Sequence, residues 1–444
     1  MAEEVWMLQT KKADFKQIGA RFRIDPVTAR IIRNRGIEGE AAIDRYLNGT
    51  LDDLYDPMLL KDMERAVSIL CEAVDTGKKI RIVGDYDIDG VCSTYILLQA
   101  FERLGSDVDF EIPDRIKDGY GINESIIEQA HADGVEVILT CDNGISAFHQ
   151  VELAKKYGMT VVITDHHEVP LDGEKEKIPP ADAVIDPKQA DCPYPFPEIC
   201  GAVVAYKLVQ VLYARRGVPR MEWLDLLEFA AIATVGDVMK LQDENRILVK
   251  YGLKKMAQTK NLGLRRLAEK NNLDLGAITA YHIGFVIGPC LNAGGRLKTA
   301  KEALALLRAQ SEEEAERLAE ELKELNDTRK DMTEQGTEAA KLQVESWYQK
   351  DKVLVVFLPE CHESLAGIIA GRLREYYQKP AIVLTRGEES VKGSGRSIDE
   401  YHMFKKLTEV SDLLLKFGGH PLAAGLSLEE KNIDEFRRRL NENA

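Results

Sequence analysis

The central part of the chain alternates short apolar runs with amphipathic stretches of helical length. Apolar residues follow helical spacing over residues 61–76. Beyond them, strands are predicted at 79–83, 108–112, 135–139, 160–163 and 183–185, with helices at 91–104 and 146–157. Strands that alternate with helices of this length indicate βαβ units and a parallel sheet covered on both faces.

The flanking regions have other patterns. Residues 1–58 predict short helices without a chemical cluster, and helices dominate again after the Pro-rich loop at 191–197. The polar run 311–347 has helical periodicity and begins with a capping box at Ser311, which predicts a connector helix. A second alternation follows: strands at 352–358, 380–385 and 391–396, helices at 364–377 and 401–415, and a Gly-rich loop at 418–425.

A chain of 444 residues is too long for one ordinary domain. We therefore expect an α/β protein in which a parallel-sheet domain is joined by a long connector helix to a smaller α/β domain. The expected boundaries are an N-terminal helical segment at 1–58, the parallel-sheet domain at 59–310, the connector at 311–347 and the smaller α/β domain at 348–444.

Composition narrows the class of protein. No apolar run approaches the ~20 residues of a membrane span, and the N-terminus lacks the pattern of a signal peptide. The seven Cys are widely spaced without a C-x-x-C pair, which is typical of reduced thiols in a cytoplasmic protein. The net charge of −15 argues against binding duplex DNA through overall positive charge, but it leaves room for clustered carboxylates. We expect no membrane partner.

Three of the predicted strands run into acidic or histidine-containing loops. The residues concerned are Asp85, Asp87 and Asp89 after the first strand, Asp142 after the third, and Asp165, His166 and His167 after the fourth. In an open parallel sheet, ligands bind beyond the carboxyl ends of the strands, so these side chains should lie over one edge.

Five aspartates at one site would repel one another unless cations lay among them. Mn²⁺ and Mg²⁺ take carboxylate oxygens, and imidazole nitrogen shifts the preference toward Mn²⁺. We therefore expect two ions, Mn²⁺ or Mg²⁺, as the cofactor. A single Asp after a strand is more often a helix N-cap, and Asp85 ranks below Asp87 and Asp89 because it could cap or position its loop. Asp165 could orient a His.

The same segments resemble a known family. Residues 84–90, 141–144 and 165–167 are similar to the first three motifs of the DHH phosphoesterase superfamily, and nearly the whole chain resembles its RecJ family of single-strand-specific 5′→3′ DNA exonucleases. Further similar stretches are 113–121, 192–202, 234–239 and 283–297, and 394–397 with 418–425 resemble the motifs of the DHHA1 domain.

The resemblance implies roles for particular residues. It implies metal ligands at Asp87, Asp89, Asp142, His166 and Asp237, with Asp142 as the bridge and Asp85 as a further candidate. His167 would face the scissile phosphate, with Asp165 also in the catalytic set. Substrate binding would fall to Arg115, Arg296, Ser394, Arg396, Gly418, Gly419 and His420. Asp186 stands where the family often has Asn, so it is a weak ligand candidate.

The implied function is hydrolysis of single-stranded DNA from the 5′ end to mononucleotides in repair and recombination. A single-strand-binding protein and a helicase are the expected protein partners, and Tyr86, Tyr120 and Tyr401 are candidates for base stacking. Two alternatives remain: a nano-RNase or cyclic-dinucleotide phosphodiesterase for very short substrates, and a non-catalytic scaffold. Family members usually continue into an oligonucleotide-binding β-barrel, whereas this chain stops at Ala444, as expected of a truncated or a naturally shorter relative.

Overall fold

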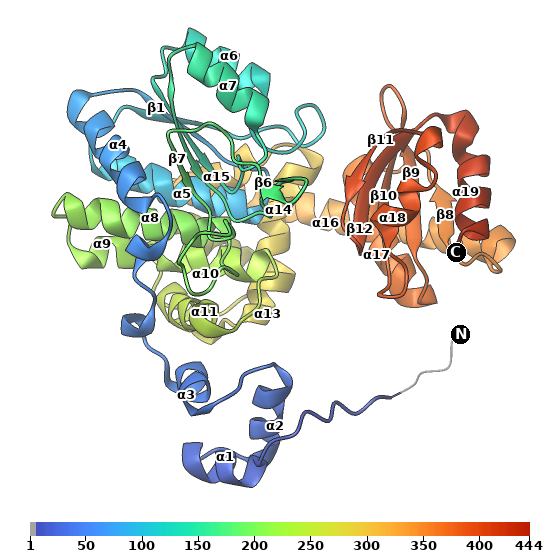
Figure 1. Cartoon of the computed structure of the whole chain (residues 1–444), viewed down its shortest axis with the longest axis horizontal. Coiled ribbons are helices and arrows are strands. Elements are labelled where there is room, and N and C mark those ends of the chain that lie inside the picture. The colour runs from blue at the N-terminus through green and yellow to red at the C-terminus, as the bar shows by residue number, and fades with distance from the viewer. Residues whose placement is uncertain (1–5) are drawn as a thin grey trace. The chain divides into compact units, whose positions relative to one another are not determined.

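The computed structural model describes residues 6–444, and the chain divides into two compact units. The larger unit contains Leu8–Glu324, and the smaller contains Leu325–Ala444. Figure 1 shows both units, each built around its own sheet. Within the described residues, every helix is too short or too polar to cross a lipid bilayer.

The larger unit is built on the predicted parallel sheet, with strand order β2-β1-β3-β4-β7. The strands are β1 (Ile80–Val83), β2 (Val108–Glu111), β3 (Val137–Cys141), β4 (Thr160–Thr164) and β7 (Ala183–Ile185). All of their pairings are parallel, which confirms the predicted sheet. β3 begins two residues later than predicted, because the Val135 N–H donates to the Ala130 carbonyl and closes the preceding helix.

Helices cover both faces of this sheet (Figure 1). On one side, α6 (Glu124–Ala132) and α7 (Phe148–Lys156) pack their apolar residues against the strands. On the other side lie α5 (Ile88–Arg103) and α8 (Gly201–Arg215), both almost wholly buried, and α10 (Leu227–Gly236) packs against them in turn. A helix that is apolar on every side belongs in the interior, so α5 and α8 are fixed by contacts all round.

This unit contains further helices, the first three of which pack around a small apolar cluster of their own. They are α1 (Phe15–Phe22), α2 (Pro26–Asn34), α3 (Glu40–Asn48), α4 (Met63–Thr76), α9 (Arg220–Leu224), α11 (Asp243–Met256), α12 (Leu262–Lys270), α13 (Ala280–His282), α14 (Gly288–Leu297) and α15 (Lys301–Arg308). A π-helical turn, Ile283–Ile287, joins α13 to α14. A short hairpin, β5 (Leu171–Asp172) with β6 (Lys175–Glu176), was not predicted.

The predicted connector is the long helix α16 (Glu312–Gln343), followed by a π-helical turn at Val344–Tyr348. The smaller unit then forms a mixed sheet of order β11-β12-β10-β9-β8. Its elements are β8 (Leu354–Phe357), α17 (Glu363–Tyr377), β9 (Ala381–Arg386), β10 (Val391–Arg396), α18 (Met403–Thr408), β11 (Leu414–Gly419), β12 (Ala423–Leu428) and α19 (Ile433–Glu442).

Two predictions for the smaller unit were wrong. The helix expected at 401–415 ends at Thr408, and the expected Gly-rich loop is the hairpin of β11 and β12. The run Leu413–Leu415 has no periodicity that separates helix from strand, so pairing with β12 decides its conformation.

Candidate metal centre

The register of the parallel strands places three aspartates at the same level of the sheet edge. Cys141 on β3 pairs with Thr164 on β4, which pairs with Ile185 on β7. The residues that follow them are Asp142, Asp165 and Asp186. Because parallel strands end on the same side, the three carboxylates start from neighbouring positions.

Asp142 has an unusual backbone conformation. Its φ of 61° lies in the left-handed region, where non-glycine residues are uncommon and which is costly unless the surroundings hold it. Its N–H donates to the Thr164 carbonyl at 3.0 Å, and its side chain packs against Gly201 at the start of α8. The turn therefore fixes the direction of the Asp142 carboxylate, which is only 2% exposed.

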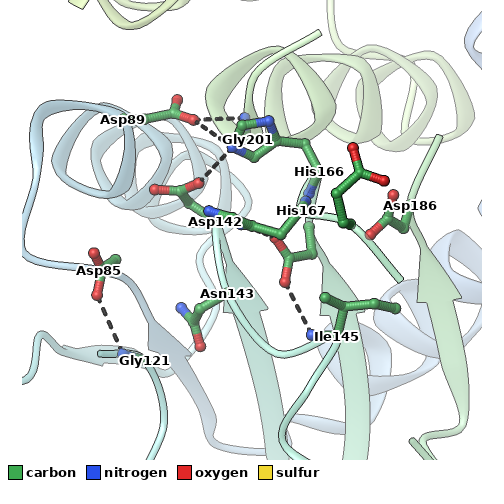
Figure 2. A network of polar contacts seen from close by, with 12 residues as sticks. Asp85, Asp89, Gly121, Asp142, Asn143, Ile145, His166, His167, Asp186 and Gly201 are labelled. Atoms are coloured by element: carbon green, nitrogen blue, oxygen red, sulfur yellow. Dashed lines mark hydrogen bonds and ion pairs between the residues drawn. The ribbon is translucent and has the colours of Figure 1, made fainter. Parts of the chain in front are cut away.

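Asp89 is held by the N-terminus of α8. It accepts hydrogen bonds from the Gly201 N–H at 2.6 Å and the Ala202 N–H at 2.8 Å, as Figure 2 shows for Gly201. The first N–H groups of a helix have no intrahelical partner and carry positive partial charge, so they favour a carboxylate. This interaction orients a fully buried aspartate.

The aspartate that caps α5 is not the one that the sequence suggested. Asp87, not Asp85, is the N-cap of α5, and its Oδ1 accepts from the N–H groups of Asp89 and Gly90. Asp85 instead accepts from the Gly121 N–H at 3.2 Å (Figure 2). An N-cap side chain must reach the N–H groups of the following turn, and only Asp87 stands at the residue before α5. The carboxylate oxygens of Asp85, Asp87 and Asp142 still lie within 4.8 Å of one another.

His166 and Asp237 complete the cluster. His166 Nε2 lies 3.1 Å from Asp142 Oδ1, 3.5 Å from Asp89 Oδ2 and 3.8 Å from Asp237 Oδ2. Asp237 is the C-cap of α10, far along the chain from the sheet motifs. The six side chains predicted as ligands therefore lie together: Asp85, Asp87, Asp89, Asp142, His166 and Asp237.

The electrostatics of the cluster favour bound cations. Burial, and then the neighbouring carboxylates, raise the pKa of Asp85 to about 8 and that of Asp237 to about 8. The same causes raise the pKa of Asp142 well above its usual value. Burial lowers the pKa of His166, so its imidazole is neutral and able to bind a metal. Such a group of buried carboxylates is stable at neutral pH only when protonated or when cations are bound.

Two polar atoms test whether this site fits a metal. Among the described residues, Asp142 Oδ1 and His166 Nδ1 are buried yet have no partner with hydrogen-bond geometry, although Asp142 Oδ1 lies 3.1 Å from His166 Nε2. Buried polar atoms are nearly always satisfied, so such atoms in a cluster of donors point to a missing ion or water. Carboxylate oxygens with one imidazole form a donor set that suits Mn²⁺ and Mg²⁺. The residues fit the expected ions.

His167 is oriented by Asp165. Its Nδ1 lies 2.7 Å from Asp165 Oδ1, and the second Asp165 oxygen accepts from the Ile145 N–H at 2.9 Å. Burial opposes the charged imidazole, but the hydrogen bond to Asp165 raises the pKa of His167 to about 9. Burial likewise opposes ionised Asp165, yet the hydrogen bond from His167 holds the pKa of Asp165 below its usual range. The ring is thus a charged donor at neutral pH.

Asp186 lies near this pair but outside the groups that could hold an ion. It is fully buried, and its Oδ1 accepts from the Lys188 N–H at 2.8 Å. Burial, and then the charge of Asp165, raise the pKa of Asp186 to about 7. The Asp186 carboxyl is therefore partly uncharged at neutral pH. In that form it is similar to the Asn amide that the family often has at this position.

Two of the predicted substrate-binding arginines lie beside Tyr86, in the loop between β1 and α5. The Arg115 guanidinium lies over the Tyr86 ring, 4.6 Å from its centroid. Arg296 is in the last turn of α14, and its charge also acts on Tyr86. Both cations thus belong to the same unit as the metal cluster and border the loop that carries Asp85 and Asp87.

The other predicted substrate-binding residues lie in the smaller unit. Ser394 and Arg396 are on β10, where Arg396 Nη1 donates to the Gly395 carbonyl at 2.8 Å and to Ser394 Oγ at 3.3 Å. Gly418 and Gly419 end β11, and the His420 N–H closes the hairpin on the Ala423 carbonyl. β12 lies between β10 and β11, so these residues share one end of the sheet.

Several residues at the centre were missed by the sequence reasoning. Asn143 ties three segments together: its Nδ2 donates to the Val83 and Cys141 carbonyls, and its Oδ1 accepts from the Ile122 N–H. Tyr120 was expected only as a candidate for base stacking, and its hydroxyl also donates to the Asp142 carbonyl at 2.8 Å while its ring contacts His167. The Asp-Asn-Gly turn could have indicated Asn143, but no local signal points to Tyr120 or Gly201.

Comparisons with known proteins agree with this geometry. The DHH family N-terminal domain matches residues 79–234, and the DHHA1 domain matches residues 350–444. The single-stranded-DNA-specific exonuclease RecJ of Bacillus subtilis is 38% identical over 440 residues, which cover 98% of this chain and 55% of that protein. The Escherichia coli RecJ is 36% identical, with 94% and 74% covered. The chain therefore spans just over half of the B. subtilis relative.

A solved structure of RecJ from Thermus thermophilus in complex with Mn²⁺ superposes with a TM-score of 0.82. It is 30% identical, and the match covers 97% of this chain and 60% of that one. The same protein in complex with Mg²⁺ gives a TM-score of 0.74 at 29% identity, with 97% and 58% covered. Relatives of this chain thus bind the two ions that the donor set favours.

Proposed function

This chain belongs to the RecJ family, and from that membership we propose that it is a metal-dependent 5′→3′ exonuclease. It hydrolyses single-stranded DNA to mononucleotides in DNA repair and recombination. The observation that carries the proposal is the cluster of Asp85, Asp87, Asp89, Asp142, His166 and Asp237 at the carboxyl edge of the parallel sheet. Four of its members, Asp85, Asp89, Asp142 and His166, are buried. A cluster of this kind is suited to phosphodiester hydrolysis with two ions.

In this proposal the six side chains would hold two divalent ions, Mn²⁺ or Mg²⁺, and Asp142 would be a ligand of both. Its carboxylate lies within reach both of Asp85 and Asp87 and of the two histidines, which supports a bridging position. When bound, the ions supply an activated water and neutralise charge on the phosphate. The rigid turn at Asp142 and the α8 N–H groups on Asp89 keep the ligands in place beforehand.

His167 acts on the substrate phosphate. Its Nδ1 is occupied by Asp165, so the opposite side of the ring is directed by that hydrogen bond. A charged imidazole donates a strong hydrogen bond to a phosphoryl oxygen and stabilises charge that develops there. Asp165 is the positioning residue: it keeps the ring protonated and in one orientation.

The proposed substrate-binding residues are found in each of the two units. Arg115 and Arg296, which border the Tyr86 loop, supply guanidinium groups to phosphates. In the smaller unit, Ser394, Arg396 and the Gly418-Gly419-His420 end of β11 offer a cation, a hydroxyl and backbone N–H groups. We further propose a cytoplasmic location and action together with a single-strand-binding protein and a helicase.

The test is digestion of single strands of about 20 nucleotides, labelled at either end, in the presence of Mn²⁺. Release of mononucleotides from the 5′ end is expected, and Asp142→Ala should lower the rate by at least about a thousandfold. Release from the 3′ end would contradict the proposed polarity. Cleavage that persists in Asp142→Ala would contradict the bridging role.

A dinucleotide substrate distinguishes the alternatives. If the protein cleaves dinucleotides rapidly and leaves the longer strand intact, it is a nano-RNase or cyclic-dinucleotide phosphodiesterase. If it binds Mn²⁺ but cleaves no phosphodiester of any length, it is a scaffold. Cleavage of the longer strand at the higher kcat/KM supports the exonuclease.

A further inference from the structure

A cavity lies in the larger unit beside two helices whose other ends reach the metal centre. Its volume is about 340 Å³, and its lining includes Tyr95 and Gln99 on α5 and Glu228 on α10. Tyr95 lies about 9 Å along α5 from Asp89, and Glu228 lies about 13 Å along α10 from Asp237. The cavity is therefore separate from the metal cluster but built on the same helices.

The inner end of the cavity contains a buried carboxyl with one unsatisfied oxygen. Glu228 is 3% exposed, and its Oε1 accepts from Thr259 Oγ1 at 2.7 Å. In the described part of the chain, Glu228 Oε2 has no hydrogen-bond partner. A buried carboxyl oxygen left unsatisfied is costly, so its presence in the wall of a cavity indicates that a polar group binds there.

The groups beside Glu228 extend this polar end. Asn261 Nδ2 donates to the Tyr95 hydroxyl at 3.1 Å, which leaves the hydroxyl proton directed away from Asn261. The Tyr95 ring packs on Phe229 with centroids 4.3 Å apart and forms an apolar wall. The inner end thus combines a hydroxyl, a carboxyl and an aromatic surface, which suits a ligand that carries hydroxyl groups.

The mouth of the cavity is cationic. Lys255 and Lys260 both pair with Asp225, so two ammonium groups face one carboxylate. The Lys260 side chain is 82% exposed and can move to meet a ligand. Burial raises the pKa of Glu228 to about 7, so this carboxyl adds only partial negative charge at neutral pH. The sum of these charges at the mouth of the cavity is positive, which favours binding of an anion.

We propose that this cavity binds a small phosphomonoester that carries hydroxyl groups, with its phosphate at Lys255 and Lys260 and a hydroxyl donating to Glu228. Nucleoside monophosphates and sugar phosphates share this chemistry, and both are of a size that a cavity of about 340 Å³ accepts. The site is independent of the proposed nuclease activity.

Isothermal titration of the full chain with AMP and with ribose 5-phosphate, in buffer with EDTA, tests the proposal. Lys260→Ala and Glu228→Gln should each weaken binding by about tenfold or more. Lys260 is so exposed that its removal leaves folding intact. Lys254→Ala removes an exposed lysine on α11 that does not line the cavity, and this matched control should bind as the wild type does.

Each result of the titrations either supports the proposal or overturns it. Tighter binding of AMP assigns the site to nucleotides, and tighter binding of ribose 5-phosphate assigns it to sugar phosphates; both support the proposal. It is overturned if neither compound binds at about 10 mM, far above the usual affinity range of specific sites. Affinity unchanged in Lys260→Ala, or equal affinity for phenyl phosphate, which has no hydroxyl group, also overturns it.

Discussion

At the residue scale, the metal cluster depends on a close contact between α8 and the turn after β3. A Cβ added at Gly201 would lie 2.7 Å from Asp142 Cβ and 2.8 Å from Asp142 Oδ1. Neither neighbour can move away, because Asp142 has a left-handed backbone and Gly201 is fixed by its N–H donation to Asp89. Only glycine allows both contacts at once.

Gly201→Ala should therefore lower kcat with Mn²⁺ by at least about tenfold and destabilise the protein by about 1–3 kcal/mol. The expected cause is displacement of Asp142 and Asp89. Gly371→Ala in α17 is the control, because a Cβ there meets nothing within 4 Å. That change should stabilise the fold by about 0.5–1 kcal/mol and leave kcat unchanged. Wild-type activity in Gly201→Ala would show that the contact is not required.

A substitution of Asp165 can distinguish a role in positioning His167 from a role in binding metal. Asp165→Asn keeps the size of the side chain but removes the charge that holds His167 protonated. We expect kcat to fall by about a hundredfold or more, with Mn²⁺ affinity measured by titration close to that of the wild type. Complete loss of Mn²⁺ binding would instead make Asp165 a ligand.

The raised pKa of Glu228 predicts that the stability of the folded protein depends on pH. Burial raises its pKa in the folded state to about 7, above the ordinary value of 4.5. The folded state therefore binds the Glu228 proton more tightly than the unfolded state does. The stabilisation that this proton provides is fully present below about pH 4.5 and is lost as the pH rises through 7. Glu228→Gln cannot lose a proton, so its free energy of unfolding relative to the wild type should rise by up to about 3 kcal/mol between pH 4.5 and pH 8. Urea titrations at several pH values measure this difference, and a difference that does not change with pH would contradict it.

At the element scale, α8 connects the metal centre to a buried ion pair. Its first turn holds Asp89, and two turns later Lys207 pairs with Glu244 of α11 at 3.1 Å. Both side chains are essentially unexposed, and Lys207 also donates to the Tyr55 carbonyl. The pair therefore fixes α8 against α11 and the N-terminal region.

Removal of one partner should cost more than removal of both. Lys207→Met leaves Glu244 charged and buried, and we expect a loss of about 3–5 kcal/mol in the free energy of unfolding. Adding Glu244→Gln should recover part of that loss, because no uncompensated charge then remains. A double-mutant cycle by chemical denaturation measures the coupling, and additive losses would contradict it.

At the scale of the whole molecule, the proposed metal ligands lie in only one of the two compact units. All six, from Asp85 to Asp237, belong to Leu8–Glu324. Mn²⁺ that binds the folded cluster should therefore stabilise this unit alone, by about 2.7 kcal/mol at a concentration one hundred times the Kd. Calorimetry should show one transition moving upward with Mn²⁺ while that of Leu325–Ala444 stays in place. Equal movement of both transitions, or an upward shift in Asp142→Ala, would contradict the assignment.

Local patterns in the sequence were sufficient for the parallel sheet, the long helix and most of the cluster. Alternation of apolar runs with amphipathic stretches has only one common solution, a parallel sheet covered by helices, and such a sheet puts Asp85, Asp142 and Asp165 at one edge. Asp237 was identified only by family resemblance, because its helix carries no local sign of a ligand.

The tertiary structure decided what depends on contacts between distant segments. Which glycine must stay bare beside Asp142 and which atoms Asn143 and Tyr120 bind follow from contacts between segments more than twenty residues apart in the sequence. The run at Leu414 became a strand because β12 lay beside it. By itself the sequence determined the chemical groups and the sheet edge at which they meet. Their orientation was decided only in the folded chain, because hydrogen bonds and close contacts act on positions in space, which periodicity does not specify.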